Sequence, residues 1–129
     1  MNTKVWGSCG WLFLHSVALN YPENPTYEDK VNMKTFFYMF GKVLPCNSCK
    51  KHYEDNLKKL PIQLESKEDL LHWTIDFHNL VNKLIGKKEL SRKEAKQKIL
   101  ALYDTNKTHT CTYIYVITLI LLFIGVKII

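Results

Sequence analysis

Two cysteines stand at the spacing that thiol redox chemistry uses. Cys46 and Cys49 form a CxxC pair directly after Pro45. A proline suits the first helical turn because its missing N–H is one that the helix would leave unpaired, so we expect a helix to begin here. Free backbone N–H groups and the positive end of the helix dipole then favour a thiolate. Such a thiolate, beside a second thiol, can exchange with a substrate disulfide or pass electrons to another acceptor.

The same pair fits two other interpretations, buried structural thiols or half of a zinc site. Cys46, Cys49 and His52 give C-x2-C-x2-H, and a fourth zinc ligand could come from another histidine, namely His72, His78 or His109. No second CxxC and no close histidine pair completes a familiar zinc spacing. A thioredoxin-like fold is excluded because no βαβ pattern surrounds the motif. On the motif alone, redox chemistry, zinc and a plain structural role all stay open.

A second group of polar residues lies on one predicted helix. His78 and Asn82 are four residues apart and share a helix face, while Asn79 and Lys83 form an adjacent ridge. Imidazole, amide and ammonium groups suit ribose, adenine and phosphate oxygens. A histidine and two amides on one otherwise apolar helix therefore predict a ligand site.

Two tryptophans could complete such a site. Trp11 and Trp73 offer flat surfaces on which the rings of a ligand could stack. Single members of this polar and aromatic group also have plainer interpretations. Trp73 fits a place in the core, and Lys83 fits a solvated surface charge. The ligand site is therefore predicted by the group as a whole rather than by any one member.

Composition limits the classes of protein to consider. The chain has 129 residues, enough for one domain with a modest core, and a net charge of +6. This charge suits an anionic membrane surface, a phosphate-bearing cofactor or nucleic acid. The lysines are scattered along predicted helix faces rather than grouped in an arm, which argues against nucleic acid.

Hydrophobic periodicity predicts an all-α fold, a four-helix bundle with a short fifth helix. No stretch alternates with a period of two residues. Capping-box patterns at Thr26, Ser66 and Ser91 mark helix starts, and Gly86 is a plausible helix stop. The predicted helices run over 5–20, 26–44, 46–60, 66–86 and 91–103. These elements form a domain over 1–103, followed by a polar linker over 104–111.

The remaining residues, 112–129, predict a membrane anchor. Thr112 to Val126 carries no charge, and the whole run is at the short edge of the roughly 20 residues that span a bilayer. Lys127 near its end can extend towards the headgroups. A buried core helix is the alternative, but the run is apolar on all faces and follows a polar linker, which favours an anchor. The excess of lysine and arginine before the run places the domain on the cytosolic side.

Three motifs in order resemble one known family. Trp6-Gly7 with Trp11 and His15 gives WGxxxWxxxH, the CxxC follows, and residues 73–87 read WxxxxHNxVNxxxGK. Together they are similar to the Erv/ALR family of FAD-linked sulfhydryl oxidases, over about residues 5–90.

The resemblance implies a helical bundle that binds FAD with the CxxC disulfide against the flavin ring. Cys49 would be the cysteine nearest the flavin, and Cys46 would exchange with a protein dithiol substrate or a thioredoxin-like relay protein. Electrons would pass to FAD and then to oxygen, giving hydrogen peroxide, and the protein would be a homodimer. The residues implied to line FAD are Gly7, Trp11, His15, Trp73, His78, Asn79, Asn82, Lys83 and Lys87, with Tyr38 and His52 as weaker contacts.

The chain departs from the family pattern at several positions. Ser8 stands where many members have arginine, which removes one phosphate contact. Many members also have a structural disulfide after the GK, whereas this chain has Glu89-Leu90-Ser91 there, so we expect packing to hold that end. Cys9 is expected to be a small buried residue of the first helix. Cys111 is expected to be a single shuttle thiol, an intersubunit thiol or an inert free cysteine.

The compact form and the hydrophobic tail are similar to sulfhydryl oxidases of large cytoplasmic DNA viruses. Such an enzyme would form disulfides on the cytosolic side of a membrane, in the host cytoplasm or the virion membrane. This setting reconciles an oxidase CxxC with a compartment that otherwise keeps thiols reduced.

Overall fold

The computed structural model describes residues 2–104, and every element in that range is an α-helix. The helices are α1 (Thr3–Leu19), α2 (Tyr27–Val43), α3 (Asn47–Lys59), α4 (Lys67–Leu84) and α5 (Arg92–Ala101). The predicted all-α class is confirmed for these residues. A boundary between two compact units falls after Lys96, within α5, and the packing described below concerns the residues before it.

Side-chain caps fix where the helices begin. Thr26 Oγ1 accepts a hydrogen bond from the Asp29 backbone N–H at 3.1 Å, and the Asp29 carboxylate accepts one from the Thr26 backbone N–H at 2.8 Å. Ser66 Oγ caps α4 through the Asp69 backbone N–H at 3.1 Å. These contacts satisfy N–H groups that a helix start leaves unpaired. The capping patterns in the sequence therefore predicted the starts of both helices correctly.

The start of α3 differs from the prediction by one residue. Pro45 lies outside the helix, and Cys46 is the N-cap residue with extended backbone angles. Its Sγ accepts a hydrogen bond from the Cys49 backbone N–H at 3.2 Å, so the sulfur takes the capping role that a serine hydroxyl usually has. The CxxC pair nevertheless occupies a helix N-terminus, a position that favours a thiolate.

The end of α4 follows the predicted glycine stop. Gly86 has a φ of 69°, a left-handed conformation that glycine adopts without steric cost. The turn brings the Lys87 backbone N–H to 2.8 Å from the Asn82 carbonyl, which closes the last helical turn. The chain then leaves α4 towards α5.

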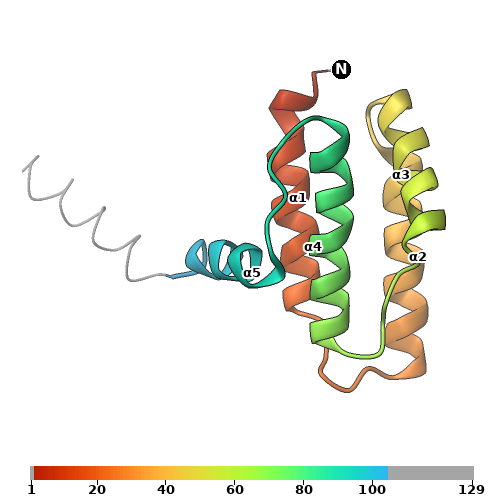
Figure 1. Cartoon of the computed structure of the whole chain (residues 1–129). Helices are drawn as coiled ribbons and strands as arrows, with labels where there is room; N and C mark the ends of the chain where they lie inside the picture. The colour runs from red at the N-terminus through yellow and green to blue at the C-terminus, as the bar shows by residue number, and fades with distance from the viewer. Residues whose placement is uncertain (1, 105–129) are drawn as a thin grey trace, which may run out of the picture. The chain divides into compact units, whose positions relative to one another are not determined.

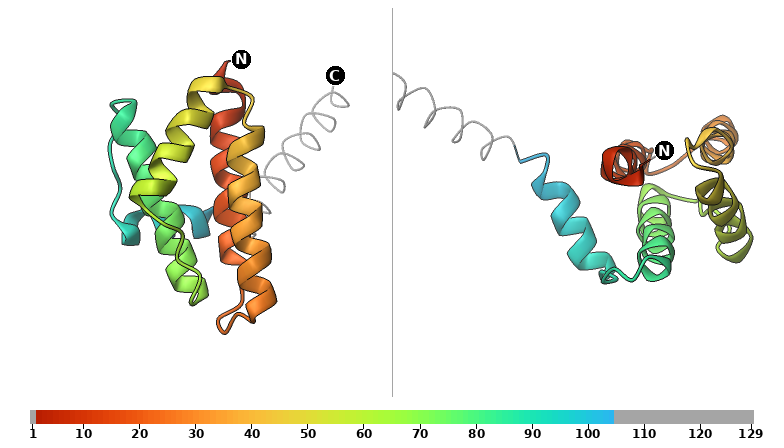
Figure 2. Two further views of the ribbon diagram at one scale, coloured as in Figure 1. Left: turned by 90° about the vertical axis from the view of Figure 1, so that its right-hand side faces the viewer. Right: turned by 90° about the horizontal axis from the view of Figure 1, so that it is seen from above.

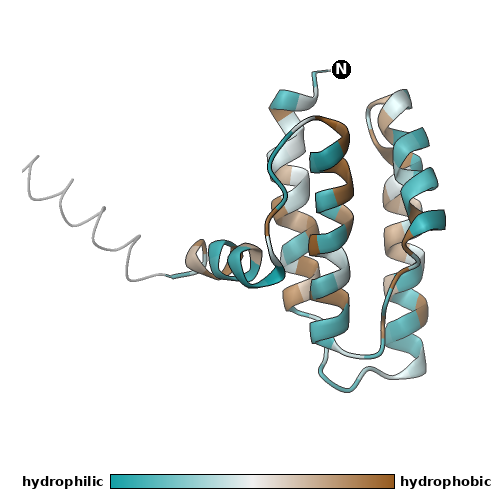
Figure 3. Ribbon diagram, viewed as in Figure 1, coloured by the Kyte–Doolittle hydropathy of each residue, from teal (hydrophilic) through white to brown (hydrophobic). Residues whose placement is uncertain are grey.

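The four long helices stand side by side in pairs (Figures 1 and 2). Helix α1 packs against α4, and α2 packs against α3. Their inward faces build an apolar core rich in aromatic rings, in which Phe37, Trp73 and Phe77 contact one another with ring centroids 4.9 Å apart in each successive pair. The outer side of α3 is largely hydrophilic (Figure 3).

Helices α2 and α3 approach closely at one glycine. A Cβ atom at Gly41 would overlap with the ring of Tyr53. Tyr53 is buried, and its hydroxyl donates to the Phe37 carbonyl at 2.9 Å. The Tyr53 ring therefore lies against Gly41, and its hydroxyl ties α3 to α2.

Part of the surface of α1 and α2 is apolar and exposed. Phe13 is 54% exposed and Met39 56% exposed, and the ring of Phe13 contacts that of Phe36 across the two helices at 6.1 Å. We define the α1/α2 apolar face by its exposed residues, Val5, Leu12, Phe13, Met39 and Val43.

Several sequence predictions fall beyond the described range. The linker from 105, the hydrophobic run 112–129, Cys111 and His109 all lie outside residues 2–104. Within the described residues, no helix combines the length and apolar character that a membrane crossing needs.

Candidate active site

Cys46 and Cys49 form a disulfide at the N-terminus of α3. Both residues are partly exposed, so an incoming thiol can reach the bond. Two donors converge on Cys46 Sγ, the Cys49 backbone N–H at 3.2 Å and the Ser48 hydroxyl at 3.2 Å. Donors around a sulfur stabilise it when it carries negative charge. The pair is therefore placed for thiol–disulfide exchange, with Cys46 as the sulfur best supported as a thiolate.

The zinc interpretation finds no support in this geometry. The two sulfurs are bonded to each other, and His52 is exposed on α3. His72 Nε2 contacts the Glu68 carboxylate at 2.9 Å. Among the described residues, no group of three or more His, Cys, Asp or Glu side chains is arranged to hold a metal ion.

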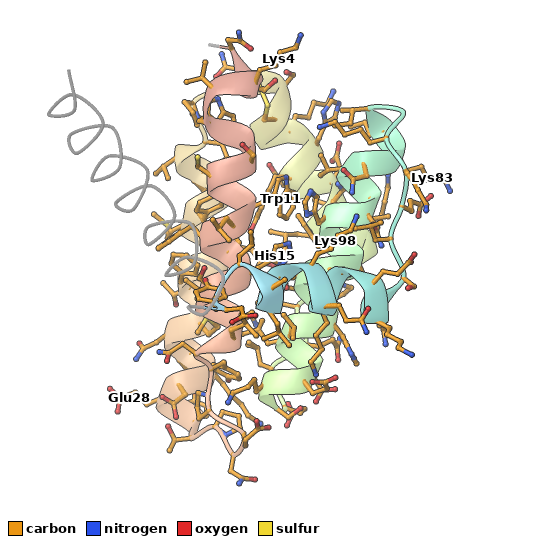
Figure 4. The ribbon with its side chains drawn as sticks, turned by 90° about the vertical axis from the view of Figure 1, so that its left-hand side faces the viewer. Lys4, Trp11, His15, Glu28, Lys83 and Lys98 are labelled. Carbon is orange, nitrogen blue, oxygen red and sulfur yellow. A yellow bond between two sulfur atoms is a disulfide. The ribbon has the colours of Figure 1, made fainter. Side chains whose placement is uncertain are left out.

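An aromatic and imidazole cluster forms between α1 and α4. Trp11 stacks on His78 with ring centroids 3.9 Å apart and planes 5° from parallel. His15 Nε2 lies 3.1 Å from His78 Nδ1, and His15 Nδ1 lies 3.1 Å from the Thr74 hydroxyl. Figure 4 shows Trp11 and His15 pointing from α1 towards α4. Three of the predicted site residues thus meet, although 63 positions separate His15 from His78.

Burial keeps both imidazoles neutral. It lowers the pKa of His15 from 6.5 to about 4. It also lowers the pKa of His78 to about 4, and the nearby His15 and Lys87 act in the same direction. Loss of hydration disfavours the charged form of a histidine, and a neighbouring positive charge adds to that effect. At neutral pH each ring therefore offers one donor and one acceptor nitrogen.

Two predicted site residues have structural partners. Trp73 is buried, and its indole N–H donates to the Leu60 carbonyl at 3.0 Å. Asn79 uses both ends of its amide on Leu90, donating to its carbonyl at 2.7 Å and accepting from its N–H at 3.1 Å. Asn79 thereby fastens the segment after α4. The predicted contacts of both residues with FAD stay predictions.

The remaining predicted site residues are more exposed. Asn82 and Gly7 are partly buried, and the space beside Gly7 is open. Lys83 and Lys87 are exposed, and Figure 4 shows Lys83 pointing outward from α4. The two weaker candidates, Tyr38 and His52, lie on the exposed sides of α2 and α3, so the structure does not bring them into the imidazole cluster.

The prediction that Cys9 is buried is wrong. Cys9 is exposed, and it is a free cysteine of the described residues. The buried side of α1 carries Leu14, His15 and Ala18. At 3.6 residues per turn, Cys9 falls on the opposite side of that helix.

Two residues that contact the site and one buried amide escaped the sequence analysis. Ser48 contacts Cys46, and Thr74 contacts His15. Asn56 is buried, and its side-chain NH2 group has no hydrogen-bond partner in the described part of the chain. A signal existed for two of them, because Thr74 lies four residues before His78 and Asn56 lies seven after Cys49, so each shares a helix face with a predicted site residue.

These groups fit the chemistry of FAD. The parallel rings of Trp11 and His78 provide a flat aromatic surface of the kind on which a ring system stacks. Two buried donors, Trp6 Nε1 and Asn56 Nδ2, have no partner among residues 2–104 and match the ring nitrogens and carbonyls of such a ligand. The exposed Lys83 and Lys87 suit a pyrophosphate.

Known proteins are similar to this chain in sequence and in fold. Residues 8–100 match the model of the Erv1/Alr family. A probable FAD-linked sulfhydryl oxidase of Acanthamoeba polyphaga mimivirus is 43% identical over 119 residues, which cover 90% of this chain and 83% of that protein. The FAD-linked sulfhydryl oxidase of one African swine fever virus isolate is 36% identical, over 80% of this chain and 90% of the relative.

Relatives also occur in fungi. The mitochondrial FAD-linked sulfhydryl oxidase of Saccharomyces cerevisiae is 42% identical over 63% of this chain, but the match spans only 43% of that longer protein. The crystal structure of the FAD-binding domain of yeast Erv1 superposes with a TM-score of 0.70 at 38% identity, covering 72% of this chain and 89% of that domain.

Proposed function

The chain belongs to the Erv1/Alr family, and from this premise we propose that it oxidises pairs of protein thiols to disulfides through Cys46–Cys49 and FAD. The observation that carries the proposal is the Cys46–Cys49 disulfide at the start of α3, in the same helical unit as the Trp11–His78 ring platform. The relatives named above as FAD-linked sulfhydryl oxidases support it. Oxygen is the final acceptor, so two thiols and one oxygen molecule give one disulfide and one hydrogen peroxide.

The thiol steps need only the two cysteines. A substrate thiolate attacks Cys46 Sγ, the bond to Cys49 breaks, and Cys49 leaves as a thiolate. The second substrate thiolate then attacks the substrate sulfur of the mixed disulfide and releases Cys46. The substrate now holds a disulfide, and the two electrons rest on the Cys46–Cys49 dithiol. The Ser48 hydroxyl and the Cys49 N–H stabilise Cys46 as it leaves.

FAD supplies the two-electron chemistry that links a dithiol to oxygen. The residues that would hold its rings and ribose are Trp11, His15, His78 and Asn82, with Lys83 and Lys87 for the pyrophosphate. The protein contributes their position and charge. The roles of the individual residues are part of the proposal.

Cysteine variants test this function. Purified full-length chain should consume oxygen when dithiothreitol is added, and Cys46→Ser and Cys49→Ser should each abolish turnover because no internal disulfide can form. Cys9→Ser, which removes a cysteine outside the pair, is the matched control and should keep the rate. Oxygen uptake that survives Cys49→Ser would refute the role of the pair.

We also propose that two copies associate through the α1/α2 apolar face. Exposed apolar patches that span neighbouring elements often mark sites of protein–protein contact. Here the face joins two neighbouring helices through the Phe13–Phe36 contact, and a second copy could cover it by the same surface. The family resemblance implies a homodimer but names no face for it.

Residues 112–129 are proposed to anchor the protein, with domain 1–103 on the cytosolic side. Support comes from the uncharged sequence 112–126 and the basic residues before it. The substrate would be a dithiol protein or a thioredoxin-like relay protein at that membrane. Alkaline carbonate extraction of cells that express the full chain should leave it in the membrane pellet, and protease added to intact cytosol-facing vesicles should digest the domain. Release into the supernatant would contradict the anchor.

A further inference from the structure

A directed chain of hydrogen bonds runs through the imidazole cluster. The Thr74 hydroxyl lies 2.8 Å from the Leu71 carbonyl, which can only accept, so Thr74 must donate its one proton there. Thr74 is 1% exposed, and a lone pair facing that carbonyl at this distance would be costly. The hydroxyl oxygen is then left to accept from His15 Nδ1 at 3.1 Å. The backbone of α4 therefore sets the direction of the first bond.

The protonation of the His15 ring determines that of the His78 ring. His15 is neutral, so a proton on Nδ1 leaves Nε2 as an acceptor. His78 Nδ1, 3.1 Å from His15 Nε2, must then carry a proton and donate. His78 is also neutral, so its own Nε2 is without a proton. Only this assignment satisfies all three contacts.

We propose that Thr74 is a positioning residue that fixes the tautomers of His15 and His78, so that His78 Nε2 always presents a hydrogen-bond acceptor to the ligand. An acceptor nitrogen meets an amino, imino or hydroxyl group, and it repels a phosphate oxygen. Resting on the proposed function, this assigns His78 to a donor group of FAD, on the adenine, the ribose, the ribityl chain or the flavin ring. The pyrophosphate must then contact other groups.

The tautomers can be measured without turnover. In the full-length chain labelled with ¹⁵N, long-range proton–nitrogen correlation spectra distinguish a protonated ring nitrogen from an unprotonated one. We expect both histidines to be protonated at Nδ1 and unprotonated at Nε2, and His78 Nε2 to stay unprotonated when FAD is added. Protonation of His78 Nε2, with or without FAD, would overturn the proposal.

Substitutions at Thr74 test its control of the two rings. Thr74→Val keeps the shape but removes the acceptor for His15 Nδ1, so both rings should shift towards the opposite tautomer and FAD should dissociate at least several-fold more readily. Thr74→Ser restores the hydroxyl and should restore the wild-type tautomers. Ile75→Val, a buried change on the next residue of α4, is the control for general loosening and should leave the tautomers unchanged.

The outcomes separate this proposal from the function itself. If Thr74→Val leaves both tautomers as in the wild type, Thr74 does not set them and the proposal fails, whatever the enzyme does. If the tautomers respond as expected but neither the wild type nor any variant binds FAD, Thr74 does set the two tautomers and the proposed cofactor is wrong. Equal changes in Thr74→Val and Ile75→Val would reduce Thr74 to an ordinary core residue.

Discussion

Two buried histidines, His15 and His78, make the stability of the fold sensitive to pH. Burial lowers the pKa of His15 and of His78 from 6.5 to about 4. Between pH 4 and pH 6.5 these two histidines bind protons in the unfolded chain but not in the folded chain. Folding stability should therefore fall as the pH is lowered from 6.5 to 4. Above pH 6.5 both states are neutral at these positions, and the histidines add no pH dependence.

The prediction is checked by the slope of the free energy of unfolding against pH. Each histidine contributes up to about 1.4 kcal/mol per pH unit in that window, less for the half-buried His78. Urea unfolding followed by circular dichroism at several pH values gives the slope, and His15→Gln should reduce it by the share of one proton. An unchanged slope in His15→Gln would show that His15 titrates normally in the folded protein.

Ser48 offers a second test at this scale. Its hydroxyl contacts Cys46 Sγ at 3.2 Å, so Ser48→Ala should reduce the fraction of Cys46 present as thiolate after reduction. Ser48 is exposed and water can replace part of the bond, so we expect alkylation of Cys46 by iodoacetamide to slow by only about threefold. Asn47→Ala, at the other middle position of the motif, is the control. Equal rates in both variants would remove Ser48 from the exchange chemistry.

At the scale of helices, Gly41 sets the distance between α2 and α3. Alanine raises helix propensity by about 1 kcal/mol, but a methyl group at Gly41 would overlap with the buried Tyr53 ring and force the two helices apart. We expect Gly41→Ala to destabilise the fold by about 1–3 kcal/mol, as overpacked cores usually do.

Gly10→Ala is the matched control for this prediction. A Cβ at Gly10 would lie 3.7 Å from the Trp6 ring, an ordinary contact in the same kind of helix. This variant should be neutral or slightly stabilising. Thermal unfolding of both variants decides the question, and a stable Gly41→Ala would mean that Tyr53 can move without loss.

Asn79 holds the segment after α4 to that helix. It binds both the N–H and the carbonyl of Leu90, in a segment that has no cysteine. Asn79→Ala should lose about 2 kcal/mol of local stability and speed hydrogen exchange at the Leu90 amide roughly 30-fold. Asn79→Asp keeps the acceptor for the Leu90 N–H, so its exchange rate should lie between those of the wild type and Asn79→Ala. Exchange at the wild-type rate in Asn79→Ala would show that packing alone holds the segment.

The sequence predicted what local chemistry decides and missed what depends on the partner helix. The capping residues Thr26 and Ser66 marked helix starts because their contacts are with residues three positions away. The CxxC position was also correct, although its sulfur cap shifted the start of α3. Thr74 was missed because its role depends on His15, which is far away in the chain. Cys9 was misplaced because its size, rather than its position relative to the buried side of α1, guided the prediction.

At the scale of the whole molecule, the α1/α2 apolar face predicts the oligomeric state. Phe13→Glu would bury a charge in an interface between two copies, so it should weaken association about tenfold or more. Sedimentation of the full chain in detergent gives the mass. Tyr27→Glu is the control, because Tyr27 is also an exposed aromatic residue but lies outside the α1/α2 apolar face. This variant should stay dimeric. A wild-type chain that is monomeric, or a dimeric Phe13→Glu, would contradict the proposed assembly.

The most direct test of the central claim is an absorbance spectrum of the purified full-length chain, recorded without oxygen before and after dithiothreitol. We expect a bound flavin band that bleaches in the wild type as electrons pass through Cys46–Cys49, and that persists in Cys46→Ser. Readmitted oxygen should restore the band in the wild type. A folded chain with no flavin band, or a band that bleaches equally fast in Cys46→Ser, would contradict a thiol oxidase that works through this pair.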